Sequence, residues 1–430
     1  MSRTSKTRRR ETPRATPARP SAPPAPLVDA PPAVTRVEVK RTTSSLAALI
    51  PFVLVSLVLA WRGARGGHSA PPPSEVPAPS GPSVVVEGAA SGEIEARPVE
   101  LRLPAVYVRA AESFDEQEAW TYKGRDLASM TAFARGAGMP ERAVDRMRSV
   151  ARCDAEGCAV MPDAELIASM GFEARSALYG ELFRFPENRV VAFPATRPGA
   201  LGRWGDLDDV SPRVRDLIER ATWRVHGNWA FSDPTWLCAQ LTSDAEKAEA
   251  IATIHRRYGL DARLRVPVSG DVEPMVRYWS RGNDADEVRR VLLDARAEGG
   301  LAKVSDLLPA MARARLNRFP SPDDVEYDCF WTAINFFEGV TPTNWFPGTE
   351  GIAPLLRANY VEIPMAEVTL GDLIALYSAD GRVTHIVNEV AGDVVFTKNG
   401  RSRTRPWVLM RLADVRDLYR FTSARAYRLR

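Results

Sequence analysis

An uncharged apolar segment at residues 44–61 constrains this chain more than any other feature of its sequence. It reads SSLAALIPFVLVSLVLAW and is rich in Leu, Val and Ala. As a helix rising about 1.5 Å per residue it would span roughly 27 Å, close to the roughly 30 Å of a bilayer's hydrocarbon core. A helix packed on a globular core would keep a polar face, which this segment lacks. We therefore predict a single transmembrane helix at 44–61.

A basic tail at residues 1–43 precedes this segment. It contains ten Lys or Arg and three Asp or Glu, a formal charge of +7, with scattered prolines. Such a composition cannot bury enough apolar surface to fold, so we predict disorder. Positive charge beside a first hydrophobic segment tends to stay in the cytoplasm. We therefore expect a cytoplasmic tail, with the bulk of the protein on the extracytoplasmic (periplasmic) side.

The rest of the chain is slightly acidic. Because the whole chain carries +3 and the tail +7, the remainder carries −4. This balance offers no basic surface for nucleic acid, and we predict no nucleic-acid partner. An alternative for the apolar segment is a cleaved signal peptide, since Val58-Leu59-Ala60 resembles a cleavage site. Its basic region would be unusually long, so an uncleaved anchor is favoured.

Composition divides the remaining chain into three parts. Residues 62–98 are rich in Pro, Ser and Gly, which predicts an extended linker. Residues 99–317 show apolar residues three or four apart, which predicts a mostly helical domain. One expected helix starts at Ser211-Pro212 and runs through Trp223. Another starts at a Ser243/Glu246 capping box and runs to Tyr258.

Residues 318–430 change character and form the third part. Alternating apolar runs at 371–377, 383–390 and 394–399 are separated by turn residues, which predicts an antiparallel meander. A helix carrying Val408, Leu409, Leu412 and Val415 and a final strand near 425–429 should follow. The predicted class is α+β: a mostly helical middle domain, then a domain with an antiparallel sheet.

The cysteines suggest one local disulfide. Cys153 and Cys158 enclose a turn-forming sequence, and an extracytoplasmic location is oxidising. Two independent small residues are the alternative. Cys238 lies in an apolar helical context and is expected to be a buried free thiol. The four Cys and four His are scattered without the spacing of a metal site, so we predict no metal and no cofactor.

Cys329 is the candidate nucleophile. Asp328 is a candidate N-cap, which places Cys329 in the first turn of a helix. Backbone N–H groups there favour the thiolate and should lower the pKa of the thiol. A nucleophilic thiol also needs a base and a group that orients the base. His385 on a predicted strand and Asn399 fourteen residues later are the candidates.

These motifs carry a resemblance to a known family. Tyr-Asp-Cys at 327–329, Gly-Asp-Leu at 371–373 and the strand histidine, in this order, resemble the NlpC/P60-like papain-fold cysteine hydrolases. The resemblance covers about residues 318–420. It implies that Cys329 is the nucleophile, His385 the general base and Asn399 the orienting residue, with Thr397 or Lys398 as alternatives.

The sequence departs from the family beside the nucleophile. The family usually has Ser and Gly there, whereas this chain has Phe330 and Trp331, whose bulk would reshape the cleft. The resemblance implies a thiol hydrolase that cleaves an amide, such as one in a cell-wall peptide, and the predicted anchor would make it membrane-bound and extracytoplasmic. The alternative is a non-catalytic envelope scaffold or binding protein with an inactive papain-like domain. An acyl-transfer or lipid-amide enzyme of the same fold is a third reading.

The remaining candidates have simpler readings. The helical domain would position a substrate or bind a partner. His226 and His255 are expected to be structural, and His68 lies in the linker. Several aromatic residues could line a groove, although core packing is favoured. They are Trp331, Phe336, Phe337, Trp345 and Phe346.

Overall fold

The computed structural model describes most of the chain beyond the linker. The described residues are 84–86, 91–111, 119–183, 188, 207, 209–225, 228–322, 324, 327–338, 348–419 and 421–430. They all belong to one compact unit, Pro73–Arg430. The predicted tail at 1–43 and transmembrane helix at 44–61 lie outside these residues. Within the described ranges, no helix has the length and apolar character needed to cross a bilayer.

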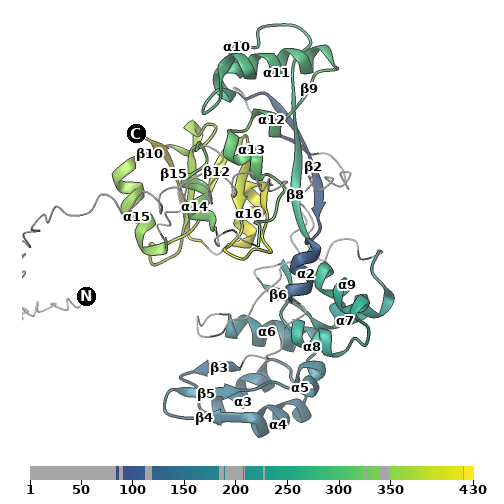
Figure 1. Cartoon of the computed structure of the whole chain (residues 1–430). Coiled ribbons are helices and arrows are strands. Elements are labelled where there is room, and N and C mark those ends of the chain that lie inside the picture. Colours follow the sequence, from purple (N-terminus) through teal and green to yellow (C-terminus); the bar gives the residue numbers. More distant parts are fainter. Residues whose placement is uncertain are drawn as a thin grey trace, which may run out of the picture. The chain divides into compact units, whose positions relative to one another are not determined.

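An antiparallel sheet forms the centre of the C-terminal part (Figure 1). Within the described residues it has six strands in the order β10-β15-β11-β12-β13-β14. This confirms the predicted antiparallel sheet and the α+β class. The strands are β10 (Tyr360–Ile363), β11 (Leu373–Tyr377), β12 (Val383–Ala391), β13 (Val394–Lys398), β14 (Trp407–Arg411) and β15 (Ser423–Leu429), with a 3-10 turn η1 (Met365–Glu367) before β11.

One face of this sheet is covered by α14 (Cys329–Ile334) and α15 (Gly348–Asn359). Leu373 and Ala375 of β11 and Ile386 of β12 pack there against these helices in one hydrophobic cluster. We call this surface of the sheet the α14 face.

The opposite face is covered by α16 (Leu412–Leu418) and by the end of a long strand. Leu376 of β11 and Val387 of β12 pack there with Val415 and with Val99. We call this surface the α16 face. Because successive residues of a strand point to opposite faces, neighbours in sequence enter different cores. Burial on both sides also explains why the strands are nearly continuous apolar runs.

Two long strands extend the ordered structure towards the N-terminus. β2 (Glu93–Leu101) pairs with β8 (Arg257–Arg265) along its whole length, and β1 (Val84–Val86) pairs with β2. The end of the range 62–98, predicted to be linker, therefore lies in a sheet. Ile94 and Ala96 drive this pairing because both are buried in the core.

The core of the C-terminal part crosses the predicted boundary at residue 317. Leu260 and Leu264 of β8 share one cluster with Phe396 and Leu409 of the sheet. The helices after β8 pack into the same cluster. They are α10 (Glu273–Trp279), α11 (Ala285–Ala297), α12 (Val304–Leu307) and α13 (Ala310–Arg315), with β9 (Leu301–Lys303) added beside β8.

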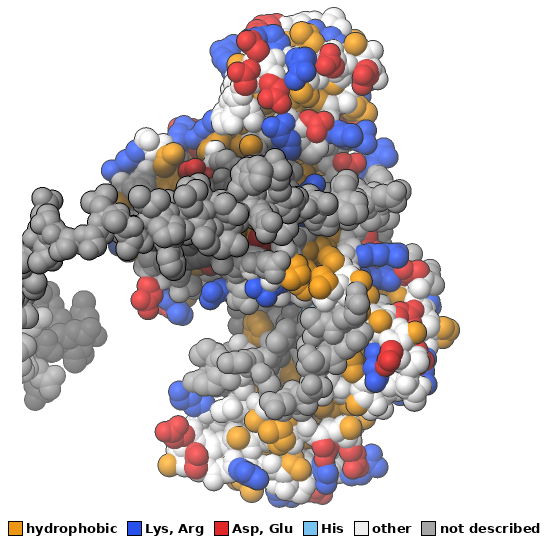
Figure 2. All heavy atoms as spheres, in the orientation of Figure 1, with side chains coloured by type: hydrophobic (Ala, Val, Ile, Leu, Met, Phe, Trp, Pro, Cys, Tyr) orange, Lys and Arg blue, Asp and Glu red, His pale blue; other side chains and the backbone are white. Residues whose placement is uncertain are grey.

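The surface over α10 and α11 carries mixed charge. Figure 2 shows Lys and Arg side chains interspersed there with Asp and Glu. Arg289 of α11 pairs with Glu273 of α10 at 2.6 Å, for example. Interspersed charges of both signs cancel at long range, so these helices do not concentrate a field of one sign.

Residues 103–254 have a hydrophobic cluster of their own and are dominated by helices. The predicted capping box is confirmed, since Ser243 and Glu246 cap α9 reciprocally. The helices are α2 (Ala105–Ala111), α3 (Leu127–Gly136), α4 (Glu141–Val150), α5 (Ala164–Ser169), α6 (Phe172–Leu182), α7 (Pro212–Ala221), α8 (Pro234–Ala239) and α9 (Asp244–Ile254). Strand β3 (Trp120–Lys123) joins β5 (Gly157–Val160) and β4 (Ala151–Cys153), and β6 (Thr222–Val225) pairs with β7 (Asn228–Phe231).

Three helix predictions extended too far into strands. Trp223 lies in β6 and Tyr258 in β8, each just after the helix expected to contain it. Val408 and Leu409 lie in β14, and only the later part of that predicted helix forms α16. The apolar spacing continues past the end of each helix, which is why the predicted helices are too long. Beyond that point, pairing with a neighbouring strand satisfies the backbone N–H and C=O groups, so tertiary context overrides the local pattern.

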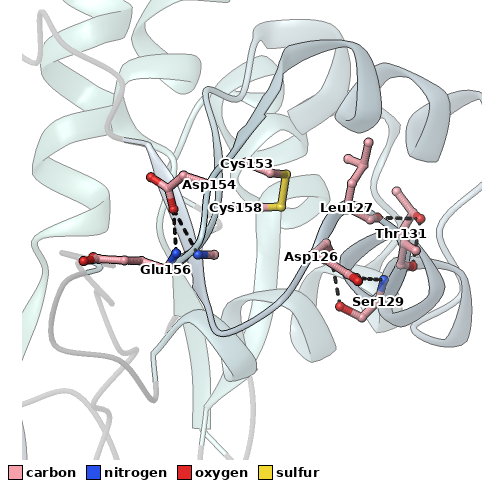
Figure 3. Close-up of a disulfide and its surroundings, with 10 residues drawn as sticks. Asp126, Leu127, Ser129, Thr131, Cys153, Asp154, Glu156 and Cys158 are labelled. Atoms are coloured by element: carbon pink, nitrogen blue, oxygen red, sulfur yellow. Dashed lines mark hydrogen bonds between the residues drawn. A yellow bond between two sulfur atoms is a disulfide. The ribbon is translucent and has the colours of Figure 1, made fainter.

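The predicted local disulfide is confirmed. Cys153 and Cys158 are joined by a disulfide and lie directly opposite each other in the β4–β5 hairpin (Figure 3). Oδ1 of Asp154 accepts hydrogen bonds from the backbone N–H groups of Glu156 (2.8 Å) and Gly157 (3.2 Å). This turn fixes the hairpin that brings the two sulfurs together. Cys238 in α8 is a free thiol, half-buried rather than buried as predicted.

The disulfide predicts a specific thiol count. Of the four cysteines in the chain, the two free ones, Cys238 and Cys329, should react in denaturant without reductant, and all four after reduction. Replacing Cys153 and Cys158 by Ser should leave that unreduced count unchanged. The replacement should lower the free energy of unfolding by about 2 kcal/mol, as expected for a short closed loop. Four reactive thiols in the unreduced, denatured wild-type protein would contradict the disulfide.

Candidate functional site

Helix α14 begins as predicted, with Asp328 as its N-cap and Cys329 in its first turn. The carboxylate of Asp328 accepts a hydrogen bond from the backbone N–H of Trp331 at 2.8 Å, so Asp328 is the N-cap. Cys329 is the first helical residue, with an exposed fraction of 7%. Its side chain packs on the α14 face with Ile386 and other apolar residues.

The electrostatics at Cys329 contradict the prediction of a lowered pKa. Burial raises the pKa of the Cys329 thiol to about 12, and the negative charge of Asp328 raises it further. Hydrogen bonds with the backbone of Ile386 in β12, and then with the backbone of Cys329 and Phe330 at the helix start, lower it, but by less. Desolvation disfavours the thiolate more than a helix of six residues favours it. At neutral pH this cysteine is a neutral, apolar core residue.

His385 lies on β12 in a different environment. Its side chain is fully buried, its ring stacks on Tyr419 with 3.9 Å between centroids, and its Nε2 lies 2.9 Å from Oγ1 of Thr397. Burial lowers the pKa of His385 to about 3. The imidazole is therefore neutral at pH 7.

The register of the sheet separates His385 from Cys329. His385 is paired with Leu376, and directly opposed residues of an antiparallel pair point to the same face. Leu376 belongs to the α16 face, whereas Cys329 packs on the α14 face with Ile386, the residue next to His385. The register therefore places the two candidate catalytic side chains on opposite faces of the sheet, and among the described residues no hydrogen bond joins them.

Among the described residues, the predicted third residue makes no hydrogen bond to His385. Nδ2 of Asn399, just after β13, donates to Sδ of Met410 at 2.9 Å. Of the two alternatives, Thr397 is the residue that contacts the imidazole. Lys398 donates instead to the backbone carbonyl of Gly400 at 2.7 Å. Alternation along β13 accounts for this, because Thr397 shares the α16 face with His385 and Lys398 does not.

The Gly-Asp-Leu motif at 371–373 has a structural role. Gly371 adopts φ +80°, and a Cβ there would collide with the ring of Phe337. The buried carboxylate of Asp372 pairs with Arg281 at 2.6 Å and with Arg428 at 2.7 Å. Burial opposes ionisation of Asp372, but these two arginines outweigh it and hold the pKa of this carboxyl below its usual range.

Sequence reasoning missed both arginines of this bridge. Arg281 follows α10, and Arg428 lies near the end of β15. A buried Asp at the start of an apolar strand signals a cationic partner, because an unpaired buried carboxylate is costly. That signal does not identify which arginines pair with Asp372, because the chain has many arginines and Arg281 and Arg428 lie 91 and 56 residues from it in sequence.

Sequence reasoning also missed a groove of about 680 Å³ on the α14 face. It is bounded by α15, the strands β10, β15 and β11, and the turn after β11. Its polar lining consists mainly of arginines and tyrosines: Arg357, Arg425, Arg430, Tyr360, Tyr377 and Tyr427. The period-two spacing of Arg425 and Tyr427 in β15 was the available signal, since it places both on one face.

The other candidates fall into the core or outside the described residues. Trp331 and Phe336 are buried in the cluster shared with β8, and Phe337 is partly buried against it, as the core reading predicts. His255 is buried at the end of α9. His68, His226, Trp345 and Phe346 lie outside the described residues. Among the residues that the structure describes, no group of three or more His, Cys, Asp or Glu could hold a metal ion.

Comparison with known proteins adds no relative to this picture. No protein-family model, no curated protein and no solved structure matches the chain. The interpretation of the site therefore depends on its own geometry.

The buried imidazole predicts a pH dependence of stability. The pKa of His385 falls from 6.5 to about 3 on folding, so the folded state binds this proton more weakly than the unfolded chain. The contribution of the neutral His385 to the free energy of unfolding is fully present above pH 6.5. It is lost, by about 1.4 kcal/mol per pH unit, as the pH falls towards 3. In urea unfolding, the free energy of unfolding of His385→Gln should decrease less steeply than that of the wild-type protein as the pH falls. An imidazole that titrates near pH 6.5 by NMR in the folded protein would contradict this.

The Asp372 bridge predicts a large effect of one substitution. Asp372→Ala removes the shared partner of Arg281 and Arg428 and should lower the free energy of unfolding by about 2 kcal/mol. This expected loss of stability is smaller than the loss on breaking a fully buried ion pair, because the side chains of both arginines are about one third exposed. Urea denaturation measures it. Asp380→Ala, which removes an exposed carboxylate paired with Arg382, is the matched control and should have a much smaller effect.

Proposed function

We propose that the C-terminal part of this protein is a non-catalytic binding module, displayed on the extracytoplasmic side of a membrane. The observation that carries the proposal is the separation of Cys329 and His385 onto opposite faces of one sheet. Hydrolysis by a cysteine nucleophile needs a thiolate, with a general base within hydrogen-bond reach of the sulfur. Here the thiol and the imidazole are each buried among other groups.

The bulky residues beside Cys329 support the same reading. Phe330 packs into the cluster of Cys329, and Trp331 packs into the cluster that includes β8. Nε1 of Trp407 donates to Oγ1 of Thr332 at 3.0 Å in the same region. These side chains occupy the volume around the helix start, where a hydrolase would need an open cleft. In this proposal the domain is NlpC/P60-like in outline and inactive.

The location in this proposal depends on two features. The apolar segment 44–61 would anchor the chain, with the tail 1–43 in the cytoplasm. The Cys153–Cys158 disulfide supports an oxidising compartment for the folded part, because disulfides persist there and are rare in the cytosol. A module so placed would act as an envelope scaffold or binding protein.

A thiol hydrolase acting on an amide, such as one in a cell-wall peptide, is the second candidate. The capped helix start at Asp328 and Cys329 favours it, because a nucleophilic cysteine is commonly placed there. It would require His385 to leave its stacking contact with Tyr419 and reach the other face of the sheet.

Thiol labelling distinguishes the two candidates. With Cys238 replaced by Ser, Cys329 should react with iodoacetamide at pH 7 roughly a thousandfold more slowly than an ordinary free cysteine, because a pKa of about 12 leaves few thiolates. Mass spectrometry measures the rate, and denaturation should restore it. The reciprocal variant, Cys329→Ser with Cys238 retained, reports the reactivity of a half-buried thiol.

The opposite result would support the hydrolase. Rapid labelling of Cys329 that is lost in His385→Ala, together with cleavage of a peptidoglycan or model-amide substrate, would overturn the non-catalytic proposal. Slow labelling in both the wild-type protein and His385→Ala is the outcome expected from the separation of the two residues.

A further inference from the structure

The groove on the α14 face has the dimensions of a ligand site. Its volume of about 680 Å³ lies within the range of roughly 300–1,000 Å³ typical of small-molecule pockets. Leu356 and Tyr427 of its lining also belong to the hydrophobic cluster of Cys329. The floor of the groove is therefore part of a packed core, which makes it a preformed surface.

The charge in the groove is predominantly positive. Its lining carries three arginines and, among the described residues, one carboxylate, Glu362. Glu362 lies 3.5 Å from Arg425, and both side chains are more than half exposed. An exposed ion pair of this kind contributes little, so Arg425 is available to another anion.

Arg357 is the second available guanidinium. It lies in the last turn of α15 and is exposed, and within the described ranges its side chain has no hydrogen-bond or ion-pair partner. Arg430 is held differently, because it donates to the backbone carbonyls of Tyr360 and Arg357. Arg357 and Arg425, the latter held by an exposed ion pair and a ring contact, can therefore turn towards an anion, while Arg430 stiffens the rim.

Tyrosines give the groove a fixed wall. The hydroxyl groups of Tyr377 and Tyr427 lie 2.6 Å apart, and the guanidinium of Arg425 lies over the ring of Tyr377, 5.1 Å from its centroid. Stacking on an aromatic ring orients a planar guanidinium. Arginine held in this way presents parallel N–H groups that match the two oxygens of a carboxylate or phosphate.

We propose that this groove binds a small ligand through a carboxylate or phosphate group, anchored by Arg357 and Arg425 and flanked by Tyr377 and Tyr427. The inference rests on the proposed binding function, to which it adds a site and a ligand class. It does not involve Cys329 or His385.

Isothermal titration of the full-length protein in a non-ionic detergent tests the proposal. Citrate and inorganic phosphate are the probes, at low ionic strength because salt screens exposed charges. Each of Arg357→Gln and Arg425→Gln should weaken binding about tenfold, the effect of losing one charge-assisted hydrogen bond. Arg290→Gln, which removes an exposed charge on α11, is the matched control and should leave binding unchanged.

The outcomes separate the ligand sources. Tighter binding of citrate, weakened by both groove variants, supports a carboxylate ligand. Tighter binding of phosphate, weakened in the same way, supports a phosphate ligand. Absence of binding with both probes, or equal weakening in Arg290→Gln, overturns the proposal. Because Cys329 labelling is measured separately, failure of the groove leaves the non-catalytic proposal intact, and rapid labelling overturns that proposal without changing the titration.

Discussion

The structure of the C-terminal part depends on one constraint: its central sheet is buried on both faces. β11 and β12 contribute alternate residues to the α14 face and the α16 face, and β13 alternates between the α16 face and the cluster that contains Trp331 of α14. A shift of register by one residue would exchange the two cores, so the pairing is strongly specified. The same alternation decides the chemistry, because Ile386 and His385 are adjacent in sequence and face opposite cores.

Asp372 connects this sheet to the segment before it. Its carboxylate is shared by Arg281, which follows α10, and by Arg428 in β15. Apolar contacts do the rest, since β8 and the helices after it share a cluster with β13 and β14. A core that is continuous across residue 317 implies that the sheet and residues 257–316 fold as one unit. The extent of the shared apolar core sets a cooperative folding unit, whereas a change in sequence composition along the chain does not.

Polar chemistry in this domain lies at the edge of the sheet rather than at its centre. At the centre, burial favours the neutral forms of Cys329 and His385, as the raised pKa of Cys329 and the lowered pKa of His385 show. At the edge strand β10 and its neighbour β15, Arg425 is more than half exposed, and it lines the groove with Arg357 and Arg430. This distribution of charge is the basis for proposing an anion site in the groove and a non-catalytic role for the cysteine.

The sequence by itself determined the local features. Turn residues and apolar runs located the meander, Asp328 and Ser243 marked helix starts, and the spacing of Cys153 and Cys158 indicated the disulfide. Each depends on residues a few positions apart, where backbone geometry leaves few options. The tertiary structure decided the rest: which face receives His385, how deeply Cys329 is buried, and which arginines meet Asp372. These depend on strand register and on contacts between distant residues, and burial reverses the pKa shift that the helix start alone predicts.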